Sequence, residues 1–171
     1  MIGRLLYKSR IKKYRKVLCS KERTKQFVLP DQVKSCLVLR STIGDNESLY
    51  SELISLYPNI EFTSLWHVNS GSVSPEDCIT ITKENFTSKG IENADDAVKL
   101  LEAPFDWLID LSNSNSEIVE LILLTSNAKC KISWRYLGGF IADITMKDVK
   151  NRVEFIQNLK QLFSNLSCNG K

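Results

Sequence analysis

Two polar loops hold the side chains best suited to chemistry. The first loop follows an apolar run at 33–41 and contributes five candidate residues: Ser41, Thr42, Gly44, Asp45 and Asn46. Its glycine permits a sharp turn, and its hydroxyls, with the free N–H groups of a following helix, can bind an anion. Asp45 is the candidate catalytic residue, as a general base. The alternative is that Asp45 or Asn46 only caps the helix that follows.

The second loop follows another apolar run, at 105–111. Its Ser112 and Asn113 are candidate ligand-binding residues, because ligands of open α/β sheets bind beyond the carboxyl ends of the strands. Small polar residues also form ordinary turns, so this loop can equally be structural. His67, the single histidine, lies within an apolar run, which predicts a half-buried structural side chain.

The sequence contains no complete cofactor or metal motif. Neither a G-x-G-x-x-G nor a Walker A glycine loop is present, so the usual dinucleotide and nucleoside triphosphate sites are not predicted. Zinc needs clustered Cys and His, whereas this chain has one His and five scattered cysteines. We therefore expect no cofactor, no metal, and reduced, mostly buried thiols in a cytoplasmic protein. A Ser-His-Asp triad has no supporting local motif.

Charge is strongly segregated along the chain. Residues 1–26 contain ten Lys or Arg and one acid, which gives +9, whereas the remaining residues contain 13 bases and 19 acids, which gives −6. No long apolar segment follows the first bases, so neither a membrane span nor a secretory signal is predicted. The candidate contacts to an anionic partner are seven residues of this basic segment: Arg4, Lys8, Arg10, Lys12, Lys13, Arg15 and Lys16.

The basic segment is predicted to be an amphipathic helix over residues 2–18. Its apolar stripe has a helical spacing and consists of Tyr7, Ile11, Tyr14 and Leu18. The two tyrosines could stack on bases while the cations contact phosphates, so RNA or the ribosome is the favoured partner. Two alternatives stay open: the stripe packs on its own domain or on another protein, or the helix lies on an anionic membrane.

The rest of the chain alternates strands with helices. Strands are expected at 33–41, 60–68, 78–82, 105–111, 130–134 and 140–146, and helices at 47–56, 94–101, 116–127 and 149–166. This alternation predicts βαβ units with right-handed crossovers. We therefore expect an appended helical arm at 1–28 and one three-layer, Rossmann-like α/β domain at 29–171. Its sheet should be mainly parallel with five to six strands, in the order 3-2-1-4-5 and a sixth at an edge.

Several details follow from local patterns. Gly138 and Gly139 suggest a tight turn that would make the sixth strand antiparallel to the fifth. Asn93 is the expected N-cap of its helix. Leu39 and Ile109 should be almost fully buried. The inward residues of the first domain helix should be Leu49, Leu53, Ile54 and Leu56. The strand aromatics expected in the core are Phe62, Trp66, Phe105, Trp107 and Trp134.

Two stretches resemble known proteins. Residues 37–45 (LVLRSTIGD) with 57–62 (YPNIEF), and 105–112 with 127–132 (NAKCKI), resemble the first Rossmann half of heptosyltransferase-like GT-B glycosyltransferases. That resemblance implies Asp45 as a catalytic base, but it does not extend to a half that binds the nucleotide sugar. The whole chain more closely resembles a short bacterial family of unknown function, which implies a fold and no activity.

These observations lead to one main hypothesis. We expect a non-catalytic cytoplasmic binding protein whose basic helix contacts RNA or the ribosome. The first alternative is an acceptor-binding or sugar-transfer protein that uses Asp45 and is completed by a separate donor-binding chain. The second alternative is an adaptor that binds another protein.

Overall fold

The computed structural model describes most of the chain. The described residues are 2–20, 26–42, 47–69, 71–73, 75–113, 117–137, 141–146 and 149–168, and the side chains of 2–8, 10, 167 and 168 are not described. Asp45, Gly44 and Asn46 therefore lie outside the described residues, as does the Gly138-Gly139 pair.

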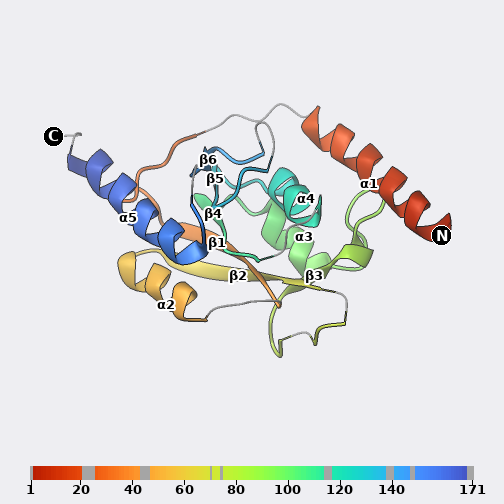
Figure 1. Cartoon of the computed structure of the whole chain (residues 1–171), viewed down its shortest axis with the longest axis horizontal. Coiled ribbons are helices and arrows are strands. Elements are labelled where there is room, and N and C mark those ends of the chain that lie inside the picture. Colours follow the sequence, from red (N-terminus) through yellow and green to blue (C-terminus); the bar gives the residue numbers. More distant parts are fainter. Residues whose placement is uncertain are drawn as a thin grey trace.

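A single six-stranded parallel sheet forms the centre of the molecule (Figure 1). The strands are β1 (Ser35–Ser41), β2 (Glu61–Val68), β3 (Thr80–Thr82), β4 (Trp107–Asp110), β5 (Cys130–Ser133) and β6 (Ile144–Thr145). Their spatial order is β3-β2-β1-β4-β5-β6. The predicted order and the Rossmann-like three-layer class are thereby confirmed. Strands β2 and β3 are added on one side of β1, and β4, β5 and β6 on the other, so the switch point of the fold lies between β1 and β4.

Burial on both faces explains why β1 lies in the middle of the sheet. Its residues from Cys36 to Ser41 are all buried, as expected for a strand covered by helices on both sides. It pairs with β2 on one side and with β4 on the other. Leu39 and Ile109, in the two central strands, are both 0% exposed, which confirms their predicted place in the core.

The sixth strand runs parallel to the fifth, so the antiparallel prediction was wrong. Ile144 pairs with Ile132 and Thr145 with Ser133, in parallel register. β5 ends at Ser133 and β6 begins only at Ile144, and a connection of this length lets the chain return to the other end of the sheet. The Asp143 carboxylate accepts the Lys131 backbone N–H at 2.8 Å and helps to hold this return.

Five helices cover the two faces of the sheet. They are α1 (Ile2–Cys19), α2 (Glu47–Leu56), α3 (Asp95–Glu102), α4 (Glu117–Thr125) and α5 (Arg152–Cys168), and a short 3-10 turn, η1, spans Lys83–Asn85. Core residues of α1, α3 and α4 pack together on one face, and those of α2 and α5 pack on the other. Figure 1 shows α2 and α5 on one side of the strands, with α1 lying beyond α4.

Two details of the helices differ from the prediction. Ile54 is 37% exposed, whereas Leu49 and Leu53 of α2 are buried and Leu56 is half-buried against the same core, as predicted. Asn93 is not the N-cap of α3, since Ala94 takes that position without a side-chain hydrogen bond. Asn93 instead adopts a left-handed conformation (φ 56°) in the turn before the helix, a conformation that Asn tolerates better than most residues.

An aromatic cluster fills the core on the α2/α5 face. Trp107 stacks on Phe163 of α5 with ring centroids 4.8 Å apart, and the Tyr57 ring meets the Trp107 ring edge-on at 5.6 Å. The Trp107 indole N–H donates to the Val28 carbonyl at 3.0 Å and so fixes the chain that leads into β1. Trp107 is the fully buried member of the five predicted core aromatics. The other four are half-buried: Phe62, Trp66, Phe105 and Trp134.

The described cysteines are unpaired and divide evenly between core and surface. Cys36 and Cys130 are buried, and Cys19 and Cys78 are exposed, so the expectation of mostly buried thiols was only half right. Burial raises the pKa of Cys36 well above its ordinary value, which keeps this thiol protonated and unreactive. Among the described helices, none combines the length and the hydrophobicity needed to cross a membrane.

Candidate functional site

Buried polar side chains gather at the carboxyl ends of the strands. Six of the buried polar or charged residues lie there, at the ends of β1, β2, β4 and β5: Arg40, Ser41, His67, Asp110, Ser112 and Ser133. Burying a polar group costs free energy unless it is hydrogen-bonded. Such a concentration at the ligand-binding edge of an open α/β sheet makes this edge the first candidate site.

Asp110 is the centre of a hydrogen-bonded network at the end of β4. Its carboxylate is fully buried and accepts hydrogen bonds from the Ser112 backbone N–H at 2.9 Å and from the Ser112 hydroxyl. The other carboxylate oxygen accepts from the Ser133 hydroxyl at 3.1 Å. It also lies 3.3 Å from Arg135 Nη2, whose side chain is 13% exposed. This network joins the ends of β4 and β5 through a buried ion pair.

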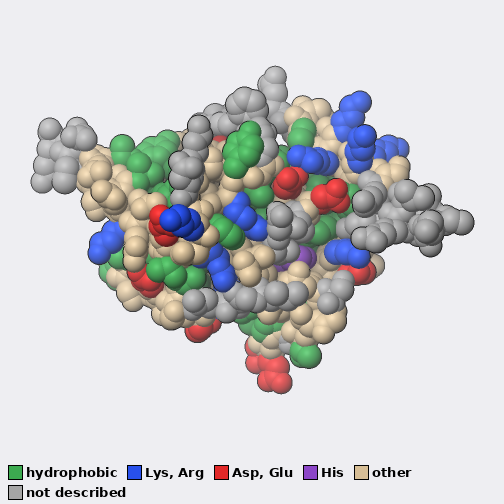
Figure 2. Space-filling view, in the orientation of Figure 1, with side chains coloured by type: hydrophobic (Ala, Val, Ile, Leu, Met, Phe, Trp, Pro, Cys, Tyr) green, Lys and Arg blue, Asp and Glu red, His purple; other side chains and the backbone are tan. Residues whose placement is uncertain are grey.

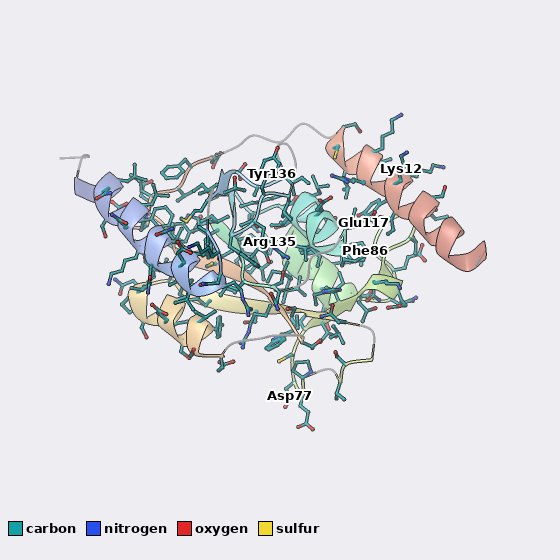
Figure 3. The ribbon with its side chains drawn as sticks, viewed as in Figure 1. Lys12, Asp77, Phe86, Glu117, Arg135 and Tyr136 are labelled. Carbon is teal, nitrogen blue, oxygen red and sulfur yellow. The ribbon has the colours of Figure 1, made fainter. Side chains whose placement is uncertain are left out.

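Arg135 is held by neighbours on two sides. Its Nη2 donates to the Ser112 hydroxyl at 3.0 Å, and its guanidinium lies 4.8 Å from the centre of the Trp134 ring. The Trp134 indole N–H donates in turn to the Ser112 carbonyl at 3.0 Å. The Arg135 Nε atom is buried and has no hydrogen-bond partner among the described residues. Figure 3 labels Arg135, which in this view lies between α5 and α4.

The two loops predicted from the sequence meet at the switch point of the sheet. The Ser41 hydroxyl accepts the Asn113 backbone N–H at 2.9 Å, which joins the ends of β1 and β4. The Thr42 hydroxyl accepts the Asn69 backbone N–H at 3.1 Å and so ties the end of β1 to the end of β2. The structure thus brings Ser41, Ser112 and Asn113 together, with hydroxyl groups that already hold the loops in place.

A second buried arginine lies at the end of β1 on the opposite face. Arg40 is 4% exposed and its guanidinium lies between the rings of Tyr50, at 4.4 Å, and Trp66, at 4.1 Å. It also forms an ion pair with Glu47 at the start of α2. Stacking and pairing of this kind compensate a buried guanidinium and clamp α2 to the sheet.

His67 is buried more completely than the sequence suggested. It is 3% exposed, at the end of β2, and its Nδ1 has no hydrogen-bond partner among the described residues. Burial lowers the pKa of His67 below its ordinary value, although the charge of Glu84 opposes the shift. The imidazole is therefore neutral at pH 7. In the described part of the chain, no group of three or more potential metal ligands comes together.

The basic helix α1 forms a second candidate site. Its apolar stripe is turned inward, since Ile11 is 2%, Tyr14 8% and Leu18 6% exposed, and α1 packs against α4. The Tyr14 hydroxyl lies 3.3 Å from Thr125 Oγ1 at the end of α4. Tyr14 therefore cannot stack on the bases of a nucleic acid, contrary to the sequence-based expectation. The Tyr7 side chain lies outside the described part.

The cations of α1 point away from this contact. Lys12, Lys13 and Lys16 are exposed, and Figure 2 shows Lys and Arg side chains gathered over α1. Lys12 is labelled in Figure 3 at the margin of the molecule. Arg15 instead forms an ion pair with Glu120 of α4 at 2.9 Å. The side chains of the other three predicted contacts are not described: Arg4, Lys8 and Arg10.

Burial raises the pKa of Glu120, whereas the nearby Arg15 lowers it and Glu117 raises it further. Arg15 therefore pairs with a partly desolvated carboxylate. For this reason, Arg15 belongs to the α1–α4 contact and not to the exposed basic surface of α1.

Sequence reasoning missed the charged members of the carboxyl edge. Each of these residues comes at the end of an apolar run: Asp110 in WLID, Arg135 in ISWR and Arg40 in LVLR. That pattern could have identified them as candidate site residues. A charged residue at the end of a buried strand must find a partner, so it marks either a clamp or a ligand contact. The partner itself depends on strand register and is not visible in the sequence.

Comparison with known proteins now adds one finding. A model of a family of unknown function, DUF6913, matches residues 7–166. The chain belongs to the DUF6913 family. No curated protein matches this DUF6913 chain, and neither does any solved structure. The expected membership of a family of unknown function is thereby confirmed, while the resemblance to glycosyltransferases stays a prediction.

Proposed function

We propose that this DUF6913 protein is a non-catalytic, cytoplasmic binding protein that presents the cations of α1 to RNA, free or within the ribosome. The observation that carries the proposal is the orientation of α1. The helix is held on the domain by its apolar stripe, so Lys12, Lys13 and Lys16 remain on its outer side.

Charge supports an anionic partner of considerable length. Residues 1–26 carry ten bases and one acid, and α1 spans 18 residues, or about 27 Å of helix. A polyphosphate backbone can meet several such cations at once and releases condensed counterions when it does so. Because Tyr14 is buried, recognition rests on the phosphates rather than on base stacking, and little sequence preference is expected.

The same orientation makes the other partners of α1 less favourable. A membrane-surface helix inserts its apolar face among the lipids, but Ile11, Tyr14 and Leu18 already pack against the domain. An adaptor that buries this stripe against another protein would first have to detach α1 from α4. The sugar-transfer alternative depends on Asp45, which lies outside the described residues, so no contact supports it.

Salt-dependent RNA binding tests the proposal. The triple variant Lys12→Gln/Lys13→Gln/Lys16→Gln should bind RNA more weakly, and its plot of log K against log salt should flatten by about 0.7 per lost contact with a single strand. The control is Lys150→Gln/Lys160→Gln, which removes charge from exposed positions just before and within α5, a helix that packs on the opposite face of the sheet from α1. Equal losses in both variants, or no RNA binding at about 50 mM salt, where phosphate contacts are strong, would refute the proposal.

A further inference from the structure

One row of polar side chains crosses four strands of the sheet. Strand register places Ser41 of β1 opposite His67 of β2, and Asp110 of β4 opposite Ser133 of β5. Ser112 and Arg135 lie two residues beyond the ends of β4 and β5. Two contacts place them beside Ser41: the Ser41 hydroxyl accepts the N–H of Asn113, next to Ser112, and Arg135 Nη2 donates to the Ser112 hydroxyl. The complete row, from one end to the other, is His67, Ser41, Ser112 and Arg135.

All four residues lie on the face of the sheet that α4 covers. Strand side chains alternate between faces, and two residues before Ser41 and His67 lie Leu39 and Leu65, which pack in the α1/α3/α4 core. On β5, the Lys131 ammonium donates to the Leu123 carbonyl of α4, so the Lys131 side chain lies on this face. Ser133, two residues further along the strand, points to the same face. The row therefore lies on one face of the sheet at its carboxyl edge, largely buried.

The two ends of the row carry buried polar atoms without partners. Among the described residues, these atoms are His67 Nδ1 and Arg135 Nε, whereas the hydroxyls of Ser41 and Ser112 between them are hydrogen-bonded. Buried polar atoms of this kind are rare in native proteins, and a bound group that satisfies them is one explanation. His67 is only 3% exposed, so bulk water does not supply a hydrogen-bond partner for its Nδ1 atom.

We propose that this row is a binding site for an elongated polar small molecule with one anionic end. Three inter-strand steps separate its ends, which makes the row about 14 Å long. The guanidinium of Arg135 suits a phosphate or carboxylate, because its Nε–H can donate to an anionic oxygen while Nη2 already donates to Asp110 and Ser112. The row crosses the switch point of the sheet, where ligands of open α/β folds bind.

Charge and hydrogen-bonding capacity narrow the ligand further. Asp110 already compensates part of the charge on Arg135, so the site fits a single anionic group better than a di- or triphosphate. At the other end, a neutral imidazole both donates and accepts, which suits a hydroxyl, an amide or a heterocycle. A nucleoside monophosphate has the length and the charge that these two ends require. The inference is independent of RNA binding by α1.

The single histidine provides a direct probe. We expect adenosine monophosphate and uridine monophosphate to shift the NMR signals of the His67 imidazole and of the Arg135 Nε–H group saturably, with a dissociation constant below about 1 mM. Adenosine without the phosphate should bind at least about tenfold more weakly, since it lacks the charge-assisted hydrogen bonds. Adenosine 5′-carboxylate in place of the phosphate tells whether a carboxylate or a phosphate is preferred. Inorganic phosphate should move only the Arg135 signal.

Two variants test the assignment by calorimetry. Arg135→Gln should weaken nucleotide binding about tenfold or more, and Asp110→Asn/Arg135→Gln should do the same without leaving a buried charge unpaired. Lys160→Gln and the triple α1 variant should bind within about twofold of the parent, because Lys160 is an exposed residue within α5 and the triple variant lies on α1. Nucleotide binding that spares the His67 signal, that survives both Arg135 variants, or that is absent at 1 mM would overturn the proposal.

Discussion

A single carboxylate at the amino edge of the sheet ties three chain segments together. Asp106 accepts hydrogen bonds from the backbone N–H groups of Lys34, at 2.8 Å, and Ser35, at 3.2 Å, and from Lys129 Nζ at 2.7 Å. Burial would raise the pKa of Asp106, but these hydrogen bonds outweigh burial and lower it below 3.8. The stabilisation is therefore present above pH 3.8 and is lost as the pH falls through the lowered pKa of the folded state.

Replacing this carboxylate gives the first prediction. Asp106→Asn should lower the free energy of unfolding at pH 7 by about 1–3 kcal/mol, because two backbone N–H groups and an ammonium lose a charged acceptor. It should also flatten the fall in stability below pH 3.8. Urea unfolding at several pH values measures both effects. Asp96→Asn, which affects only an exposed pair with Lys99, is the control and should change little.

Tyr57 is a second residue whose role is testable. Its hydroxyl is buried without a partner among the described residues, and burial raises its pKa to about 12. Tyr57→Phe should stabilise the fold by about 1 kcal/mol, because an unsatisfied buried hydroxyl is removed and the ring contacts remain. The parent should lose stability as the pH rises from 10 towards 12, since only the unfolded tyrosine ionises readily there. Tyr136→Phe, at a 77% exposed position, should leave stability unchanged.

At the scale of elements, α1 packs its apolar side chains against the domain and exposes its lysines to solvent. Ile11→Ala should cost about 2–5 kcal/mol of unfolding free energy, because the side chain is 2% exposed in the contact with α4. Val17→Ala on the same helix, at 50% exposure, should cost less than about 0.5 kcal/mol. Equal costs in chemical denaturation would mean that α1 does not dock on the domain in solution.

The two central strands allow the same comparison between buried and exposed side chains. Leu39→Ala and Ile109→Ala should each lower the free energy of unfolding by about 2–5 kcal/mol, since both side chains are fully buried between helices. Ile54→Ala, on the partly exposed side of α2, should cost less than about 1 kcal/mol. A thermal melt that ranks Ile54 with the two strand residues would contradict the burial pattern.

The elements were largely predictable from the sequence, and the side-chain network was not. Apolar runs such as 33–41 identified the central strands, and the handedness of βαβ crossovers left few possible strand orders. The direction of β6 is set by its parallel pairing with β5, which the local signal of two glycines does not determine. The pairing of Asp110 with Arg135 depends on the register between β4 and β5, so only the polar residue types were visible beforehand.

At the scale of the whole molecule, charge and function separate into different regions. The cations proposed to meet RNA lie on α1, outside α4, whereas the polar row proposed to bind a small molecule lies at the carboxyl edge of the sheet. The two proposals therefore predict independent losses: the α1 lysine variants should spare nucleotide binding, and the Arg135 variants should spare RNA binding. A variant set that lost both together would indicate one shared site instead.

The shortness of the outer strands has a consequence for self-association. β3 spans three residues and β6 spans two, so each side of the sheet offers few free backbone groups to another chain. Long, flat edge strands are the usual templates for strand exchange and for amyloid growth. This fold lacks such templates in its described part, so concentrated solutions of the native protein should not extend its sheet from one molecule to the next.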